Sequence, residues 1–493
     1  DFKSGAIELT DLDSWCSSNA AYDNRDASAD GDPTSCNPSG PNANVWFKFQ
    51  ALADTATIDV ITDVHGAGSL YGSMDRQEIS LVNAAGQTIH CVGAPSVNNW
   101  GGELSLSVDT LSPGNPYWVK VDHISSRYGN SGTFSVCIDN TNNTYYSIGN
   151  GAWDDPSNWS KISHNGTPAT SYPGMGDIVY IRGNQIGVTE KDTAAAVYMT
   201  VADGPTQLLL DGGSLLVNGK LTMANSGTSQ TGNITLQNDA ALTVKDNMSV
   251  RRDGGDQSFE ITLSDASEMH VSGNLSFSST AGTSEMSLIR LNQESVLDVG
   301  NDMDLTHTGG TKMWVELNDQ AQWMAGRDIS LNASSANAIE IAANNASAIQ
   351  LSRDIVRTAP GYGIVTFNDN STLYLNGNSY LQKLTSSQGS GGDSIRYQNV
   401  TIHNTKVTSP QVTVVDTVEI HGILNLQDGV IGTTSDHLLV LLPTASVNGG
   451  SDQSYVEGPL KKTGNTPFTF PVGQSSNYQP LSIAAPDNIT DAY

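Results

Sequence analysis

An apolar position returns every 26 to 28 residues through the middle of the chain, between about residues 205 and 360. Three columns keep this register. They consist of Leu221, Met248, Leu275, Met303, Ile329 and Ile355; of Leu210, Leu236, Leu263, Leu291 and Leu317; and of Val217, Val244, Val271, Val299 and Ala325. Three short strands per period predict a right-handed parallel β-helix. Each coil exposes backbone edges that only further coils, stacked about 4.8 Å apart, can satisfy.

A turn rich in Asp and Asn follows the first strand of most periods. Its members are Asp211, Asn238, Asp265, Asn292, Asn318 and Asn368. Asx side chains tolerate turn conformations and bond to nearby backbone, so we expect a row of stacked turns. Binding of calcium by this row, or a substrate groove along it, is the alternative interpretation. Arg327 and Arg353, one coil apart, are expected to be solvated turn residues.

Residues 1–141 carry a different pattern, in which short runs alternate apolar with polar positions between Gly, Asn and Pro turns. The runs are 44–49, 56–61, 79–82, 104–108 and 117–121. Alternation with a period of two is typical of half-buried strands. The sequence therefore predicts a compact all-β domain ahead of the β-helix.

Three motifs of this region stand in a fixed order: NVWFKF at 44–49, LSPGNPYWVKV at 111–121 and GTFSVC at 132–137. Together they resemble the pre-peptidase C-terminal-type domain of bacteria, which is a β-sandwich. The resemblance covers most of residues 1–141. Because that domain is usually an accessory of secreted proteins, the resemblance implies export and does not imply a reaction.

Residues 142–204 contain GNGAWDDPSNWS at 149–160 and PGMGDIVYI at 173–181. These resemble the opening segment of repetitive surface proteins of Bacteroidota. We expect Trp153 and Trp159 to cap the open end of a β-helix that spans 205–450; an exposed sugar-stacking pair is the alternative. Residues 451–493 resemble another recurring element of the same proteins and are expected to begin a further small β domain of a longer molecule.

The charge balance limits the partners. The chain has 23 Lys and Arg against 51 Asp and Glu, a formal net charge of −28. So acidic a protein repels a phosphate backbone, which excludes general nucleic-acid binding. No run of about 18 apolar residues predicts direct insertion into a membrane. The first residue is Asp1, so we expect any targeting peptide to have been removed.

All four cysteines, Cys16, Cys36, Cys91 and Cys137, lie in the first 140 residues. An even set confined to one segment indicates disulfides and an oxidising, extracellular location. Of the three possible connectivities we favour Cys16 with Cys36 and Cys91 with Cys137, because each closes within a local sheet. No CxxC or Cys/His spacing indicates redox or zinc chemistry.

Parallel β-helices are common in polysaccharide lyases and hydrolases, so an enzyme is an alternative that the sequence must be tested against. A glycosidase needs two facing carboxylates, and a lyase needs a base beside a charge sink. Glu316 and Glu340 could lie on neighbouring coils, but two outward acids on so acidic a chain are expected to be solvated. Nucleophile-elbow, zinc-protease and phosphate-loop motifs are absent from the sequence. No catalytic residue is predicted.

The segment DASADGDPTSCN at 26–37 has the spacing of a calcium loop. Its candidate ligands are Asp26, Ser28, Asp30, Asp32 and Asn37. The twelfth position is Asn and not the bidentate Glu of the standard loop. Two interpretations stand: a calcium site, with calcium as the one cofactor considered, or a polar loop held by a disulfide.

The triplet of Asp, then Ser or Thr, then an apolar residue occurs repeatedly and resembles the O-glycosylation site of exported Bacteroidota proteins. The resemblance implies sugars on Thr55, Thr110, Thr193, Ser394 and Thr417.

The leading hypothesis is a non-catalytic extracellular adhesin resembling type IX-exported adhesins of Bacteroidota. A β-helix stalk would present the sandwich, with Trp100 in the loop 97–102 offering a stacking face to glycans or cell-surface molecules. One alternative is a secreted polysaccharide lyase or hydrolase. Another is a filament subunit that assembles with copies of itself, as a homo-oligomer.

Overall fold

The computed structural model describes residues 2–10, 12, 15–51, 53, 55–63, 70, 72–93, 102–112, 115–124, 131–140, 144–225, 230–253, 258–280, 287–308, 312–334, 338–358, 363–386, 395–486 and 490–492. The chain divides into two compact units, Asp1–Asn143 and Thr144–Tyr493. Regular structure in the described ranges is strand, apart from short 3-10 turns at Lys3–Gly5 and Pro156–Asn158. Within those ranges no helix has the length and apolar character needed to cross a membrane. The expected all-β class is confirmed.

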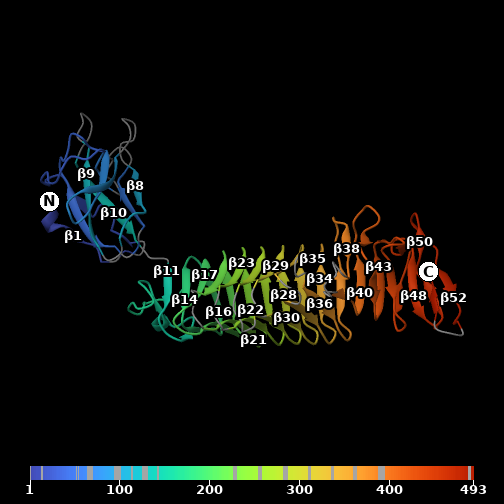
Figure 1. The fold of residues 1–493 in the computed structure, drawn as a ribbon. Coiled ribbons are helices and arrows are strands. Elements are labelled where there is room, and N and C mark those ends of the chain that lie inside the picture. Colours follow the sequence, from blue (N-terminus) through green and yellow to red (C-terminus); the bar gives the residue numbers. More distant parts are fainter. Residues whose placement is uncertain are drawn as a thin grey trace. The chain divides into compact units, whose positions relative to one another are not determined.

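The first unit contains two sheets (Figure 1, blue). Sheet A has the order β1 (Ile7–Glu8), β4 (Val45–Gln50), β9 (Pro116–His123), β6 (Gln77–Val82) and β7 (Thr88–Gly93). Sheet B has the order β2 (Trp15–Cys16), β10 (Thr133–Asp139), β5 (Ala56–Ile61) and β8 (Glu103–Val108), with β3 (Tyr22–Asp23) also on β10. Inward side chains of both sheets, including Phe47, Ile79 and Phe134, form one apolar core. This arrangement is compatible with the expected β-sandwich.

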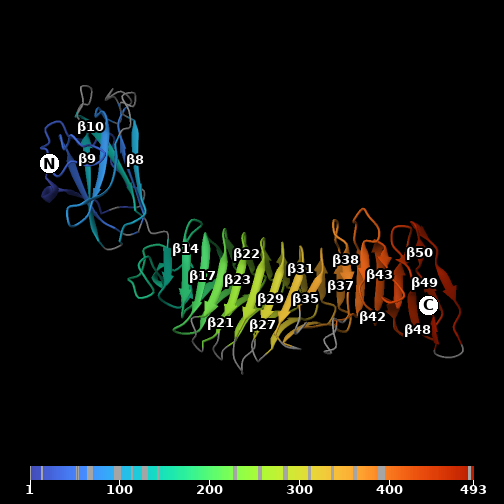
Figure 2. The same cartoon turned by 45° about the horizontal axis from the view of Figure 1, so that its top comes forward.

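The second unit is a solenoid of three sheets, parallel except for one antiparallel pair at the first coil, whose strands lie side by side in both views (Figures 1 and 2). The first solenoid sheet contains β13 (Trp159–Ser160), β11 (Thr144–Ser147), β14 (Ile178–Arg182), β17 (Ala196–Val201), β20 (Leu221–Asn225), β23 (Met248–Arg252), β26 (Leu275–Ser279), β29 (Met303–His307), β32 (Ile329–Ala333) and β35 (Ile355–Thr358). The second contains β12 (Gly151–Ala152), β15 (Gln185–Val188), β18 (Thr206–Asp211), β21 (Gly232–Gln237), β24 (Phe259–Leu263), β27 (Ser287–Leu291), β30 (Met313–Leu317), β33 (Ile339–Ala343), β36 (Ile364–Phe367) and β39 (Ile395–Arg396). The third contains β16 (Lys191–Ala194), β19 (Ser214–Val217), β22 (Ala241–Val244), β25 (Glu268–Val271), β28 (Val296–Val299), β31 (Gln322–Ala325), β34 (Ala348–Leu351), β37 (Thr372–Leu375), β40 (Asn399–His403), β43 (Ile423–Asp428) and β46 (Ser446–Gly449).

The three apolar columns of the sequence are register columns of these sheets. Leu221 pairs with Met248, and the same column continues through Leu275 to Ile355. The column from Leu210 to Leu317 and the column from Val217 to Ala325 are likewise unbroken. Their side chains are buried in a single core, apart from Ile355, which is half-buried and packs against it, so stacking of like on like fills the solenoid interior.

Stacked amides stabilise the turn after the second solenoid sheet. The Nδ2 group of each Asn donates to Oδ1 of the Asn one coil before, in a ladder of Asn292, Asn318, Asn344 and Asn368 with distances of 3.0, 3.1 and 2.9 Å. The row of turn residues expected from the sequence did not include Asn344. Asn238 and Asp265 lie one residue further along their turns than the ladder residues do. Together with Gly212 of an earlier coil they form a column of residues in the left-handed conformation, with φ of 70° for Gly212, 57° for Asn238 and 60° for Asp265. The expected row of Asx turns is thus present as two adjacent columns.

The solenoid is longer than the sequence indicated. It begins at Thr144, because β11 pairs in parallel with β14 and β14 with β17. It also continues beyond residue 450. One additional four-stranded parallel set contains β38 (Gln382–Leu384), β41 (Val412–Val414), β44 (Ile431–Gly432) and β47 (Val456–Glu457). Another contains β42 (Val418–Ile420), β45 (Leu439–Leu441) and β48 (Leu460–Gly464), with β53 (Thr490–Ala492) antiparallel to β48.

Two hairpin-like pairs complete this end of the chain: β49 (Phe468–Phe470) with β52 (Leu481–Ile483), and β50 (Gly473–Gln474) with β51 (Asn477–Tyr478). Because β47 and β48 stack directly on the preceding coil, residues 451–493 are part of the same compact unit. The expected boundary near residue 450 therefore does not separate a domain. The strands of this segment pair with strands about 20 to 25 residues earlier in the chain. No apolar column in the sequence continues into these coils, so the sequence did not reveal the pairing.

Candidate functional site

The outer face of sheet A carries polar and charged side chains that a loop covers. We call residues 24–44 the cover loop. On β4, Val45 and Phe47 point into the core, so Trp46 between them points outward; on β9 the same alternation turns Lys120 outward. Trp46 and Lys120 face each other across the strands, yet they are only 3% and 2% exposed. An outward strand position that stays buried requires a third layer, and the cover loop supplies it.

A disulfide fastens this layer to the sheet. Cys36 of the cover loop is bonded to Cys91 of β7, and Cys16 of β2 is bonded to Cys137 of β10. The expected pairs Cys16–Cys36 and Cys91–Cys137 are therefore wrong. Cys16 and Cys137 are direct register partners on antiparallel strands, with Cα atoms 4.0 Å apart. Strands far apart in sequence are neighbours in this sandwich, which places each cysteine beside a distant partner.

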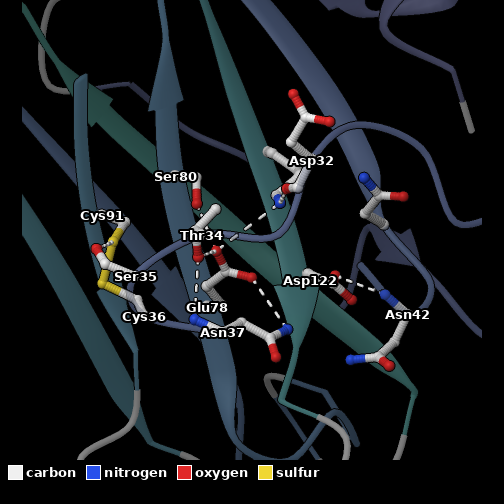
Figure 3. A network of polar contacts seen from close by, with 12 residues as sticks. Asp32, Thr34, Ser35, Cys36, Asn37, Asn42, Glu78, Ser80, Cys91 and Asp122 are labelled. Carbon is white, nitrogen blue, oxygen red and sulfur yellow. Dashed lines mark hydrogen bonds and ion pairs between the residues drawn. A yellow bond between two sulfur atoms is a disulfide. The ribbon is translucent and has the colours of Figure 1, made fainter. Parts of the chain in front are cut away.

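Glu78 on β6 is the centre of a buried polar network (Figure 3). Thr34 Oγ1 donates to Glu78 Oε1 at 2.7 Å, and Asn37 Nδ2 donates to Oε2 at 3.3 Å. Ser80 Oγ also donates to Oε1 at 2.5 Å, and Lys120 Nζ lies 3.9 Å away. Hydrogen bonds and a cation together compensate a carboxylate that is 0% exposed.

A second buried carboxylate, Asp122, holds the end of the cover loop. The backbone N–H groups of Asn42 and Ala43 donate to its two oxygens at 2.9 and 3.1 Å (Figure 3). Burial lowers the pKa of the neighbouring His123, with Asp122 opposing that shift. Two carboxylates on adjacent strands thus anchor the cover loop. Glu78 binds the side chains of Thr34 and Asn37, and Asp122 binds main-chain amides at the end of the loop.

A cleft of about 490 Å³ opens between the cover loop, the hairpin after β6 and the start of the chain. Its lining includes Lys3, Asp30, Asp32, Trp46 and Lys120. The indole Nε1 of Trp46 is buried and has no hydrogen-bond partner in the described part of the chain. Lys120 Nζ donates to the main-chain oxygen of Asp32 at 3.3 Å, and Lys3 donates its backbone N–H to Asp30 Oδ2 at 2.6 Å. The site is polar, mixed in charge and walled by fixed elements.

A glycine shapes the cleft wall at a point where no side chain would fit. Gly31 has φ of +92°, a left-handed value that L side chains rarely adopt. A Cβ added there would lie 3.1 Å from Cζ2 of Trp46. The close approach of the loop backbone to the indole therefore depends on glycine at this position.

The candidate calcium ligands differ in exposure and in their partners. Asp26 and Ser28 are exposed, and Asn37 is buried with its Nδ2 on Glu78. Asp30 accepts from the backbone of Lys3, and Asp32 is exposed at the cleft. Among the described residues, no group of three His, Cys, Asp or Glu side chains is placed to hold a metal ion.

The remaining predicted site residues lie in different surroundings. Trp153 and Trp159 are 0% exposed, pack edge to face with centroids 5.2 Å apart, and belong to the solenoid core at its first coil. They offer no exposed face for stacking on a sugar. Trp100 and Ser394 lie outside the described residues. Thr55, Thr110 and Thr417 are exposed, whereas Thr193 is half-buried.

On the solenoid surface, the two carboxylates considered for catalysis, Glu316 and Glu340, each pair with a positively charged side chain. Arg290 Nε donates to Glu316 at 2.9 Å, and Lys312 Nζ donates to Glu340 at 2.9 Å. The register pairs Glu340 with Trp314 and Glu316 with Ala342, so the two acids occupy different columns. The two turn arginines are also paired: Arg327 with Asp302 and Arg353 with Asp328, each at 3.5 Å.

One constellation on the third solenoid sheet had no sequence signal. His270 Nδ1 lies 2.8 Å from Asp298 on the next coil, and its Nε2 lies 3.1 Å from Ser272 Oγ. This is the contact order of a nucleophile, a base and an orienting acid. The backbone N–H groups of Ser272 and Gly273 donate to carbonyl oxygens of the preceding coil. They are thus committed to stacking and are not free to stabilise an oxyanion.

No protein-family model matches the chain, and no curated protein matches it. Among solved structures, the catalytic domain of a GH87 α-1,3-glucanase in complex with nigerose is similar at 9% identity, with a TM-score of 0.16 and coverage of 85% of this chain and 86% of that chain. A variant of that domain in complex with tetrasaccharides is similar at 8% identity, with a TM-score of 0.18 and coverage of 89% and 96%. At these values the likeness assigns no activity.

Proposed function

We propose that this chain is a non-catalytic extracellular surface protein, in which the solenoid is a stiff spacer and the disulfide-bonded sandwich is a binding module for glycans or cell-surface molecules. The observation that carries the proposal is the register of the solenoid. Three sheets of ten, ten and eleven described strands stack coil on coil, and between Leu210 and Ile355 three apolar columns keep one side chain over another. Every coil adds about 4.8 Å to such a stack, which gives length without a new domain.

The side chains along the solenoid favour rigidity. Amide ladders, paired carboxylates and a continuous apolar interior bind each coil to its neighbours. The two acids considered for hydrolysis, Glu316 and Glu340, are engaged by Arg290 and Lys312. The sandwich, in contrast, combines a polar cleft with a covering layer that a disulfide fixes. We therefore place binding on the sandwich and spacing on the solenoid.

Export is part of the proposal. Two disulfides in the first unit are compatible with an oxidising compartment. The triplets at Thr55, Thr110 and Thr417 place their hydroxyls at exposed positions, where a glycosyltransferase could reach them. Mass spectrometry of chain isolated from its natural source would show hexose-type mass additions on these threonines; unmodified peptides at all three would remove this part of the proposal.

The test compares binding and catalysis on the same preparation. Fluorescently labelled full-length chain is applied to a panel of immobilised glycans and to intact cells, with heat-unfolded chain as control. In parallel, soluble polysaccharides, including α-1,3-glucan, are incubated with the chain and assayed for new reducing ends and unsaturated sugars. Saturable binding without release supports the proposal. Release of sugar products, or no binding to any surface, overturns it.

A further inference from the structure

The first solenoid sheet ends at β35, although the coils of the solenoid continue. The strand that follows β35 one period later in the chain is β38, and it begins a separate parallel set (Figure 1). Among the described strands, β35 pairs with β32 alone and β38 with β41 alone. The third sheet runs through the same coils without a break, because β37 pairs with β40 over four register pairs. We call the break between β35 and β38 the seam; it interrupts one wall of the solenoid and leaves another continuous.

Side-chain hydrogen bonds replace the strand ladder at the seam. Gln382 is 0% exposed, and its Nε2 donates to the main-chain oxygens of Leu351 and Arg353 at 2.9 and 2.8 Å. Asp354 Oδ1 accepts from the backbone N–H of Lys383 at 2.7 Å. A parallel ladder would join the two strands by evenly spaced main-chain bonds along their length. These side-chain bonds instead join the seam where both strands begin.

The packing of the core also changes at the seam. The inward column that contains Leu305 and Leu331 continues with Arg357, which is 7% exposed. The Arg357 guanidinium donates to the main-chain oxygens of Gly363 and Ser386 at 3.4 and 3.2 Å. A cavity of about 140 Å³ remains there, lined by residues from both sides of the break. A buried cation and an unfilled volume thus replace close apolar packing, so the two sides are joined less tightly than regular coils are.

We infer that the seam is a hinge of the solenoid, which opens between β35 and β38 while the third sheet keeps its ladder. Opening the seam breaks a few side-chain bonds, whereas separating β37 from β40 breaks a full strand ladder. The coils on either side therefore rotate against each other about the third sheet. This hinge goes beyond the proposed function, because it adds a joint to the spacer and does not depend on what the sandwich binds.

The experiment measures distances in the full chain by double electron–electron resonance between spin labels on introduced cysteines. The four native cysteines do not take the label, because each is in a disulfide. Ser330→Cys with Lys383→Cys spans the seam on the side of the first sheet. Ser276→Cys with Ser330→Cys spans two regular coils of that sheet. Thr372→Cys with Ile423→Cys crosses from β37 to β43 on the third sheet.

Three further variants are read with the same labels. Asp354→Ala removes the acceptor of the N–H of residue 383, and Asp354→Asn keeps an acceptor there. Asp302→Ala is the matched control, because Asp302 Oδ1 accepts from the backbone N–H of Asp328 at 3.2 Å, where the strand ladder is intact. The comparison of the three label pairs in the parent chain stands by itself where a variant does not fold.

We expect the distance distribution across the seam to be at least about twofold wider than for the other two pairs, and Asp354→Ala to widen it further. Asp354→Asn and Asp302→Ala should leave every width unchanged. Equal widths for all three pairs in the parent chain would show a continuous rod and overturn the hinge. Equal widening of the third-sheet pair by Asp354→Ala would also overturn it, because whole coils would then separate. Neither result bears on binding by the sandwich, so the two proposals are tested separately.

Discussion

Glu78 and Lys120 form an ion pair on the outside of a β-sheet, yet their side chains are only 0% and 2% exposed, with Oε1 and Nζ 3.9 Å apart. The cover loop encloses both and contributes Thr34 and Asn37 as hydrogen-bond donors to the carboxylate. Desolvation of two charges is costly, and such a pair persists only when hydrogen bonds satisfy it as well. The position of the cover loop and the state of this pair are therefore linked.

Replacing one member of the pair should destabilise the sandwich strongly. Glu78→Gln leaves Lys120 buried without a counter-ion, so we expect unfolding to become easier by about 3 to 5 kcal/mol. The measurement is urea unfolding, with the sandwich transition identified by limited proteolysis. The matched control is Glu8→Gln, because Glu8 pairs with Lys48 at 3.8 Å on the same sheet but in solvent. It should change stability by less than about 1 kcal/mol. Equal effects of both variants would contradict the role of burial.

The two disulfides should differ in their effect on the cleft. Each closes a long loop, of 121 and 55 residues, and loop-closure entropy assigns each about 4 to 5 kcal/mol. Removing Cys36–Cys91 with two serines frees the cover loop, so the amides of cleft residues should exchange hydrogen faster. Removing Cys16–Cys137 should lower stability without that local effect. Hydrogen exchange read by mass spectrometry distinguishes them, and peptide mapping under non-reducing conditions checks the connectivity itself.

Asp192 should make the solenoid less stable as pH rises. It occupies an inward column, one coil before Leu215, and is 7% exposed. Burial, reinforced by Asp154 and Glu190, raises the pKa of Asp192 to about 6 from the model-compound 3.8. The folded state therefore holds this proton more tightly than the unfolded state does. Its contribution is fully favourable below about pH 4 and is lost as pH rises through about 6.

Asp192→Asn removes this penalty. At pH 8 the variant should be more stable than the parent by about 1 to 3 kcal/mol, and at pH 4 the two should be equal. Thermal unfolding at both pH values measures this. Asp304→Asn, at an outward position of β29, serves as the control and should change neither value. A gain that is the same at both pH values would show that ionisation of Asp192 is not the cause.

The amide ladder should contribute to stability coil by coil. Asn318 donates to Asn292 and accepts from Asn344, so Asn318→Ala breaks two hydrogen bonds and removes the ladder partner of Asn292 Oδ1 and of Asn344 Nδ2. We expect a loss of about 1 to 3 kcal/mol. Asn332→Ala, at an exposed position of β32, should cost less than about 0.5 kcal/mol. Denaturant unfolding of the second unit gives both values, and equal costs would refute the ladder.

The sequence by itself determined the solenoid, because its evidence is local and repeated. Each coil must place an apolar side chain over that of the coil before. Apolar residues spaced by about 26 to 28 positions therefore show which residues pair between coils. Leu221 and Met248 were therefore assigned to one column correctly, and so were Leu210 and Leu236. Where coils became irregular, beyond Ile355, no column remained to show that β47 and β48 still stack.

The tertiary structure alone decided the candidate site. Alternation placed Trp46 and Lys120 on the outer face of a sheet, which by pattern is a solvated face, and nothing local indicated a covering loop. Cys16 and Cys137 are neighbours only because β2 and β10 of the sandwich pair, a choice made by packing across more than 100 residues. Periodic stacking repeats one local rule and can be read along the chain. A covered face, a disulfide partner and an unused indole N–H depend on contacts between distant segments, which no local pattern encodes.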